Sequence, residues 1–219
     1  MMNMRKKIGI SLVRTEVYDL LKEEILRGEI KFGQRLNIRK LSKEFGISPT
    51  PVRDALLALA AIGLVRCVPR VGFFVTELNE NYINETTESQ IMVETFCLEK
   101  YFDEIKNSPD ILKIYDEAKE VVNTKSRKLF DDSDQNLHML IVRSSSNKTI
   151  IDFYEKLWDK MDLVRHLNKR YLDSNKEHLL IIESILRNEK KNAVESLLKH
   201  IENVKNETLK NLESSKVTE

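Results

Sequence analysis

Four side chains in the second half of the sequence have types and spacings that suit a metal ion. Asp134 and His138 are four residues apart, so on a helix they project from one face about one turn apart. His178 and His200 each lie eleven residues from the centre of a polar segment at 187–191, so a helical hairpin bent there would bring them to equal height. Three imidazoles and a carboxylate suit Zn, Ni or Mn and leave coordination positions open. The alternative is that these are three unrelated histidines.

The composition indicates that helices must position these residues. The 219 residues are 41% hydrophobic and 32% charged, which is enough apolar material for one large domain or two small ones and excludes a disordered chain. With only 6 Gly and 4 Pro, long uninterrupted segments predict a mainly α fold. The 2 cysteines, Cys67 and Cys97, have no CxxC spacing, so the sequence supports neither a disulfide framework nor a cysteine-type zinc site.

The sequence contains no segment that we expect to cross a membrane. The longest uncharged run near the middle of the chain, 55–65, is too short to span a bilayer. Arg14 interrupts the apolar stretch near the N-terminus before a signal-peptide core can form. We therefore expect a cytoplasmic protein with no membrane partner.

The charge is balanced overall but not along the chain. The net charge is +1, yet residues 1–75 contain 14 Lys or Arg and 7 Asp or Glu, and the remainder contains 22 and 28. A basic module attached to an acidic one is typical of a nucleic-acid-binding domain joined to a domain with another task, because phosphate neutralisation needs clustered cations. Chance clustering of solvated charges is the alternative.

The basic part has the pattern of a winged helix-turn-helix. Ser11 is predicted to cap a first helix that Gly28 ends, and Asn37 precedes a short second helix closed by Gly46. Ser48 is predicted to cap a third helix with prolines in its first turn, where a missing N–H costs little. Residues 64–75 then form two β-rich runs around a turn, which predicts a hairpin wing.

The remainder is predicted to be an antiparallel helical bundle. Helical periodicity continues from Asn79 to the C-terminal region, with breaks or caps expected at Ser108, Ser133, Asn147 and Asp173. The expected helices are 79–106, 109–126, 133–145, 148–172, 175–188 and 191–213. We expect residues 1–76 to form the DNA-binding winged helix-turn-helix, 77–89 to form a linker or hinge, and 90–219 to form the helical domain; the effector-binding role of 90–219 follows from the family resemblance given below.

The stretch PTPVRDALLALAAIGLV, followed by a glycine-containing wing, resembles the GntR family of bacterial transcription regulators over about residues 10–76. The resemblance implies a recognition helix in the major groove and DNA contacts from Arg39, Ser48, Thr50, Arg53, Arg70 and Gly72. Pro49 stands where many members have Arg, so the operator sequence cannot be transferred.

Residues 83–212 resemble the FCD ligand-binding domain of the FadR subgroup, on the elements DQNLH, EHLLIIESI and LKHI. The resemblance implies a divalent metal ion at Asp134, His138, His178 and His200. It also implies a small organic acid, for which many relatives carry an Arg where this chain has Gln90; Arg143 or Arg165 is an expected substitute. His166 has no partner at ligand spacing and is predicted to line the pocket or lie on the surface.

Together these observations predict a transcription regulator, most simply a repressor, that dimerises to bind a pseudo-palindromic DNA operator and responds to a small molecule. One alternative is a metal-dependent enzyme using the Asp/His site, although no HExxH motif is present. The other is a DNA-binding regulator whose bundle only dimerises and binds no metal. Effector, operator and metal identity stay open at this stage.

Overall fold

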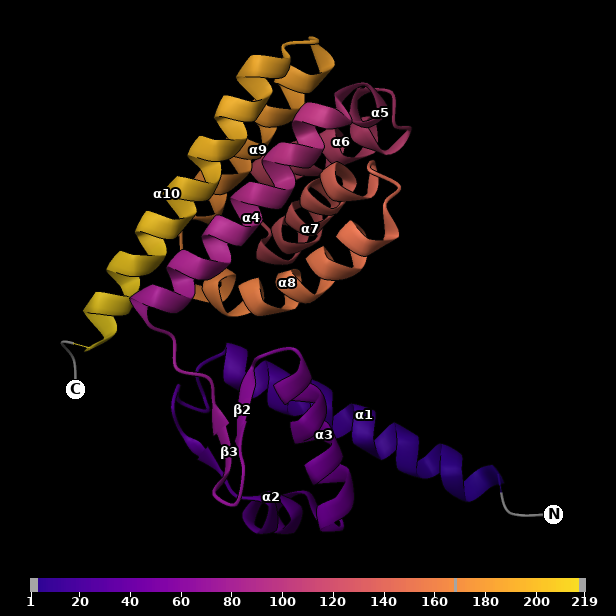
Figure 1. The fold of residues 1–219 in the computed structure, drawn as a ribbon, viewed down its shortest axis with the longest axis vertical. Helices are drawn as coiled ribbons and strands as arrows, with labels where there is room; N and C mark the ends of the chain where they lie inside the picture. The colour runs from indigo at the N-terminus through magenta and orange to yellow at the C-terminus, as the bar shows by residue number, and fades with distance from the viewer. Residues whose placement is uncertain (1–3, 168, 217–219) are drawn as a thin grey trace. The chain divides into compact units, whose positions relative to one another are not determined.

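The computed structural model describes the backbone of residues 4–167 and 169–216 and the side chains of residues 13–161, 164–165 and 169–213. The chain forms two compact units, Met1–Leu78 and Asn79–Glu219. The mainly α fold class is confirmed, and Figure 1 shows the small sheet within the first unit and the helices of the second. None of the helices in the described part of the chain has the length and apolar character needed to cross a membrane.

The first unit is a winged helix-turn-helix, as predicted. Its elements are α1 (Met4–Leu26), β1 (Arg35–Leu36), α2 (Ile38–Phe45), α3 (Pro49–Ala61), β2 (Val65–Val68) and β3 (Gly72–Val75). The strands form an antiparallel sheet in the order β1-β3-β2, with Val65 opposite Val75 and Leu36 opposite Phe73. The sequence pattern did not predict β1, because two residues are too few to show an alternation of burial.

Local capping explains both ends of α2. The Asn37 side chain accepts hydrogen bonds from the backbone N–H groups of Arg39 and Lys40, and Gly46 ends α2 at φ 64°, in the left-handed region. Pro49 occupies the first turn of α3, but the Ser48 side chain forms no capping hydrogen bond. The expectation that Ser11 caps the first helix is wrong, since α1 already begins at Met4.

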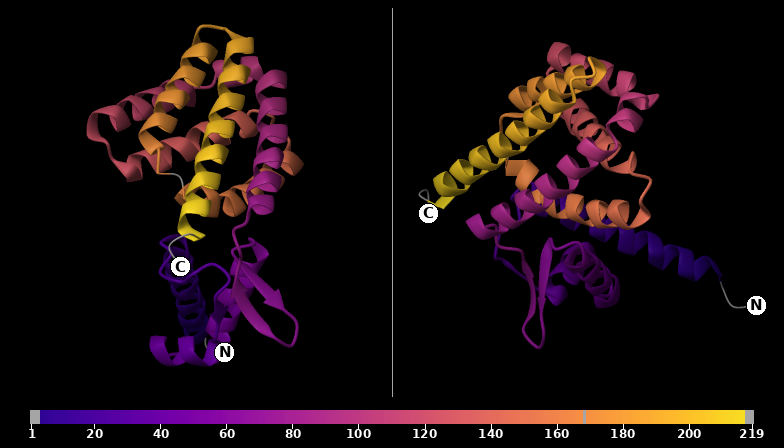
Figure 2. Two further views of the ribbon diagram at one scale, coloured as in Figure 1. Left: turned by 90° about the vertical axis from the view of Figure 1, so that its left-hand side faces the viewer. Right: turned by 45° about the horizontal axis from the view of Figure 1, so that its top comes forward.

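The second unit is a helical bundle. Its elements are α4 (Glu80–Lys100), α5 (Phe102–Lys106), α6 (Asp110–Thr124), α7 (Arg127–Arg143), α8 (Lys148–Leu167), α9 (Tyr171–Leu186) and α10 (Lys190–Lys216). Helix α9 and α10 form a hairpin, and α10 also packs along α4, as both views in Figure 2 show. Leu98 of α4, Ile181 of α9 and Leu197 of α10 belong to one apolar core, which also includes Leu137 of α7.

Several sequence-based boundaries in this unit change. The expected helix 79–106 is divided into α4 and α5, α8 ends at Leu167 and not at 172, and Asp173, expected as a break or cap, lies in the first turn of α9. Ser133 was expected to begin a helix but lies buried inside α7; the cap is Ser126, whose hydroxyl accepts a hydrogen bond from the Leu129 N–H. Residues 80–89 of the expected linker form the first half of α4, which Asn79 caps through the N–H of Tyr82. The stretch between β3 and α4 is therefore limited to 76–79.

Candidate functional site

The bundle brings the four predicted metal ligands together from three helices. Asp134 and His138 come from α7, His178 from α9 and His200 from α10, and all four are buried. One donor atom from each lies within 4.8 Å of the others. The hairpin expected from the polar segment at 187–191 is present, and it sets His178 Nε2 3.1 Å from His200 Nε2.

Two glutamates orient two of the imidazoles. Glu94 Oε2 lies 2.6 Å from His138 Nδ1, and Glu177 Oε2 lies 2.9 Å from His200 Nδ1. A carboxylate acceptor favours a proton on the Nδ1 atom that it faces, which leaves the Nε2 lone pair of each neutral ring pointing at the centre of the cluster. Such carboxylate–histidine pairs are typical of metal sites.

His178 is held differently. Its ring stacks on Phe130 at 5.7 Å with an interplanar angle of 2°, and its Nδ1 atom is buried with no hydrogen-bond partner among the described residues. Burial, together with the neighbouring imidazoles of His200 and His138, lowers the pKa of His178 well below its usual value. Burial also acts to lower the pKa of His138, but the Glu94 carboxylate outweighs it and the pKa is raised.

The donor geometry fits a divalent cation. Asp134 Oδ1 lies 3.4 Å from His178 Nε2 and 3.7 Å from His138 Nε2. Donors bound to one ion at about 2.0–2.2 Å must lie roughly 3–4.3 Å apart, depending on the angle between the bonds. Convergent nitrogen lone pairs and a carboxylate in a buried site would repel one another, and a cation at the centre removes that cost.

A small cavity of about 30 Å³ adjoins the cluster. Polar side chains of Thr86, Thr87, Gln90 and Arg165 line it together with the Trp158 ring. Arg165 lies over that ring at 4.1 Å, and its Nε atom is 3.2 Å from Asp134 Oδ2. The structure thus places Gln90 and Arg165, two of the three expected effector contacts, beside the ligand cluster.

The third expected contact, Arg143, is elsewhere. Its side chain is 59% exposed and pairs with Glu155 at 2.8 Å, and it lines a different surface pocket at the other end of α7. Its inclusion in the effector pocket is therefore wrong, because nine residues after Asp134 the α7 surface has turned to solvent. The side chain of His166 lies outside the described residues.

Sequence reasoning missed the residues that support the ligands. Glu94 is fully buried and accepts hydrogen bonds from Gln90 Nε2 at 2.8 Å and from the Tyr154 hydroxyl, in addition to its contact with His138. Glu177 faces Arg170, Asn203 and His200, and these partners hold its pKa at about 2 against the opposing effect of burial. The sequence did offer a signal for Glu94: it lies beside Val93 and Cys97 on an apolar helix face, where a glutamate is rarely buried without a partner.

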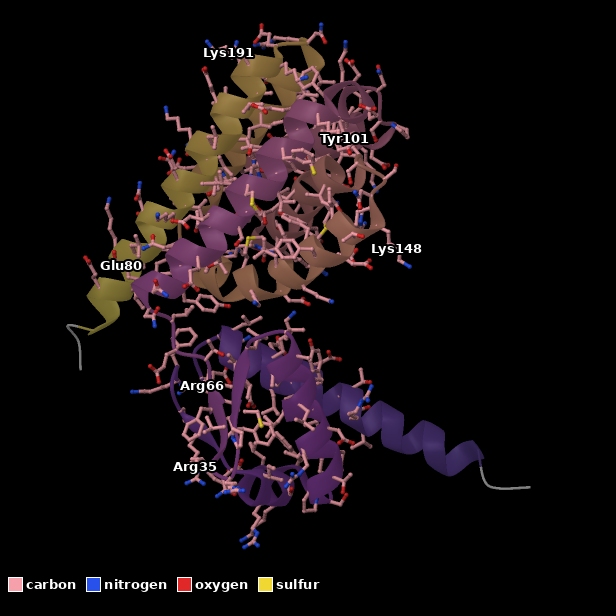
Figure 3. All side chains as sticks on the ribbon, viewed as in Figure 1. Arg35, Arg66, Glu80, Tyr101, Lys148 and Lys191 are labelled. Atoms are coloured by element: carbon pink, nitrogen blue, oxygen red, sulfur yellow. The ribbon has the colours of Figure 1, made fainter. Side chains whose placement is uncertain are left out.

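The first unit carries a separate basic groove of about 780 Å³. Among its lining residues are Arg35, Arg39, Arg53, Arg70 and Gly72, contributed by β1, α2, α3 and the wing. Arg35, labelled in Figure 3, donates a hydrogen bond from Nη2 to the Val71 carbonyl at 2.7 Å and was not predicted. Gly72 has φ 137°, a backbone conformation that other residues rarely adopt, so the start of β3 requires glycine.

The remaining predicted DNA contacts are Ser48 and Thr50. Both are exposed at the start of α3, but neither lines the groove. The groove therefore gathers four of the six predicted residues, and it adds Arg35 as a fourth cation.

Two family models match this chain. The model of bacterial regulatory proteins of the gntR family matches residues 13–75, and that of the FCD domain matches residues 92–203. Among curated proteins, an HTH-type transcriptional regulator of unassigned role, YdhC from Bacillus subtilis, is 29% identical over 84% of this chain and 86% of its own. The gluconate operon transcriptional repressor of Bacillus licheniformis is 28% identical over 84% of this chain and 80% of its own.

Solved structures give the same picture. The Zn²⁺-bound FCD domain of TM0439 is 50% identical, with a TM-score of 0.60, and covers 62% of this chain and 96% of that one. A GntR protein from Rhodococcus sp. RHA1 aligns with a TM-score of 0.71 over 90% of this chain and 97% of its own; at 19% identity it supports the fold alone.

Proposed function

The chain belongs to the GntR family of bacterial regulatory proteins and carries an FCD domain. From this premise we propose that it is an operator-binding repressor, controlled by an organic acid that binds only when a metal ion is present. The family consists of DNA-binding transcription regulators and not of enzymes. One observation carries the proposal: Asp134 and the imidazoles of His138, His178 and His200 converge beside a cavity that Arg165 lines.

The metal ion would be held by Asp134, His138, His178 and His200. Zn, Ni and Mn all suit nitrogen and carboxylate donors, and the Zn²⁺-bound state of the related TM0439 domain favours zinc. When bound, the ion supplies a Lewis-acidic position for an anionic oxygen of the effector. Glu94 and Glu177 keep the ligand rings in the metal-binding tautomer, and Arg165 both orients Asp134 and offers a charge for the acid.

The DNA contacts are assigned to Arg39, Arg53, Arg70 and Gly72 in the groove, with Ser48 and Thr50 near the phosphate backbone and Arg35 added. A homodimer would present two α3 helices to a pseudo-palindrome of double-stranded DNA in the cytoplasm. The repressor of the gluconate operon among the relatives supports repression as the outcome. Effector binding acts through the short segment 76–79 by favouring one arrangement of the dimer's two DNA-binding units. The coupling free energy that this takes is about 1–3 kcal/mol.

The test starts from DNA sequences selected from a random library by the purified full-length protein. Operator affinity is then measured by fluorescence anisotropy with zinc-loaded and with chelated protein, and with acetate, glycolate, citrate and gluconate as probes. We expect at least one acid to change operator affinity about 5- to 150-fold, and only with metal present. If neither acid nor metal changes it, the bundle serves dimerisation alone.

Replacing Glu177 by Gln should weaken zinc binding by about 10- to 100-fold, because the amide no longer holds His200 with a charged acceptor. Competition with a chromophoric chelator measures this affinity. Glu183→Gln is the matched control, since Glu183 lies on the same helix and bonds the Tyr115 hydroxyl instead. Equal zinc affinity of wild type and Glu177→Gln would contradict the role given to Glu177.

A further inference from the structure

Helix α4 lines the cavity with the polar side chains of Thr86, Thr87 and Gln90, and Arg165 of α8 lines it with a positive charge. We propose that the effector is a short hydroxy acid whose hydroxyl donates a hydrogen bond to the side-chain carbonyl of Gln90 while its carboxylate faces Arg165. This inference rests on the proposed function and names the chemical class of its ligand.

Glu94 decides which end of the Gln90 amide faces the cavity. Gln90 and Glu94 lie four residues apart on one face of α4, and Gln90 Nε2 is 2.8 Å from Glu94 Oε1. The carboxylate repels the amide oxygen, so the nitrogen must face it. Glu94 is itself held by the Tyr154 hydroxyl and by His138 Nδ1, and burial together with Glu94 raises the pKa of Tyr154 well above its usual value, so the hydroxyl stays a donor.

Thr86 makes the neighbouring part of this wall an acceptor as well. It lies one turn before Gln90, and its hydroxyl donates to the Tyr82 carbonyl, which leaves its oxygen lone pairs for the cavity. Gln90 forms no other hydrogen bond in the described part of the chain, so its Oε1 atom is free to accept one. A ligand carboxylate against these two oxygens would be repelled, whereas an alcohol hydroxyl can donate to them.

The position of Arg165 beside Asp134 favours one direction of the ligand. The Arg165 guanidinium is stacked on Trp158 and paired with Asp134, on the side of the metal ligands. The anionic end of a ligand belongs there and its hydroxyl belongs against α4. The cavity is small, about 30 Å³, which favours the shortest hydroxy acids over longer ones.

The experiment compares acetate with glycolate, which adds one hydroxyl to the same carboxylate. Trp158 is the only tryptophan of the chain and lines the cavity, so its emission reports binding to zinc-loaded full-length protein. We expect wild type to prefer glycolate, and Gln90→Met, which keeps the length but removes the acceptor, to reduce that preference about 3- to 10-fold. Any preference caused by the hydroxyl meeting the metal persists in Gln90→Met, so the change in the ratio isolates Gln90.

Gln135→Met, at an exposed position of α7, is the matched control and should keep the wild-type preference. Gln90→Arg should raise acetate affinity relative to glycolate. Equal binding of the two acids, or a preference unchanged in Gln90→Met, would overturn the inference while leaving an acid-responsive regulator intact. If neither acid binds, the inference fails; the proposed function fails with it only if the longer acids also leave operator affinity unchanged.

Discussion

Replacing His178 by Ala should abolish the part of the protein's thermal stability that depends on metal. In the proposed metal site His178 is the donor from α9, and its Nε2 atom contacts both His200 and Asp134, so its loss removes one of four donors and the link between three helices. A ligand at about a hundred times its dissociation constant stabilises the native state by roughly 2.7 kcal/mol. At about 2–4 °C for each kcal/mol, chelation should lower the Tm of zinc-loaded wild type by about 5–10 °C.

The measurement is the difference in Tm between zinc-loaded and chelated protein for each variant, paired with the metal content of untagged protein. Taking this difference cancels the cost of the cavity that His178→Ala leaves in the core. Ser184→Ala is the control, because Ser184 lies on the same helix and its hydroxyl bonds the Leu180 carbonyl. If the Tm of His178→Ala still changes on chelation, or if wild type contains no metal, the proposed metal site is wrong.

Replacing Arg53 by Ala should weaken operator binding by about 5- to 150-fold, the effect of losing about 1–3 kcal/mol at a base contact. Arg53 is exposed on the first turns of α3 and lines the same groove as Arg39 and Arg70. The N-terminal residues of a recognition helix contact the base edges, so within the DNA-binding unit this side chain has the largest expected effect on operator affinity. Anisotropy titrations on selected operator DNA measure it.

The control must separate this contact from a loss of net charge. Arg27→Ala removes one positive charge from the end of α1, where Arg27 pairs with Glu23 at the surface and lines no part of the groove. It should change operator affinity little. A base contact at Arg53 also predicts altered preference at one operator position, whereas a phosphate contact predicts a salt dependence reduced by about one unit of slope. Unchanged affinity in Arg53→Ala would mean that α3 is not the recognition helix.

In the proposed function, helix α4 links effector binding to DNA binding through the chain itself. Its face from Thr86 to Glu94 lines the cavity beside the Asp/His cluster and contacts His138, and the helix begins five residues after the end of the wing strand β3. An effector that shifts α4 therefore acts on a segment covalently close to the DNA-binding unit. The segment 76–79 is the position at which substitutions by Gly should weaken the coupling of acid to operator binding.

The sequence by itself determined the fold class, the family and the order of the main elements, but not the two-residue strand β1 or the division of the expected helix 79–106 into α4 and α5. Helix periodicity, the Gly46 turn and the prolines at the start of α3 are local signals, which can be identified without knowledge of the tertiary structure. Within each pair of predicted ligands the same holds, since a spacing of four residues on α7 and equal distances from the α9–α10 bend depend only on helix geometry. That the two pairs form one cluster was implied by the family resemblance, and the packing of α7 against α9 and α10 brings them together.

Only the tertiary structure decided which other groups meet those ligands. Glu94 is 44 residues from His138 and Glu177 is 23 residues from His200, so no spacing rule connects either pair. The same reason separates Arg165, which packs beside Asp134, from Arg143, which faces solvent at the far end of α7. Helical periodicity shows which face of a helix is buried, but packing between helices selects the partners on that face, and in this protein those partners orient the imidazoles and the Gln90 amide.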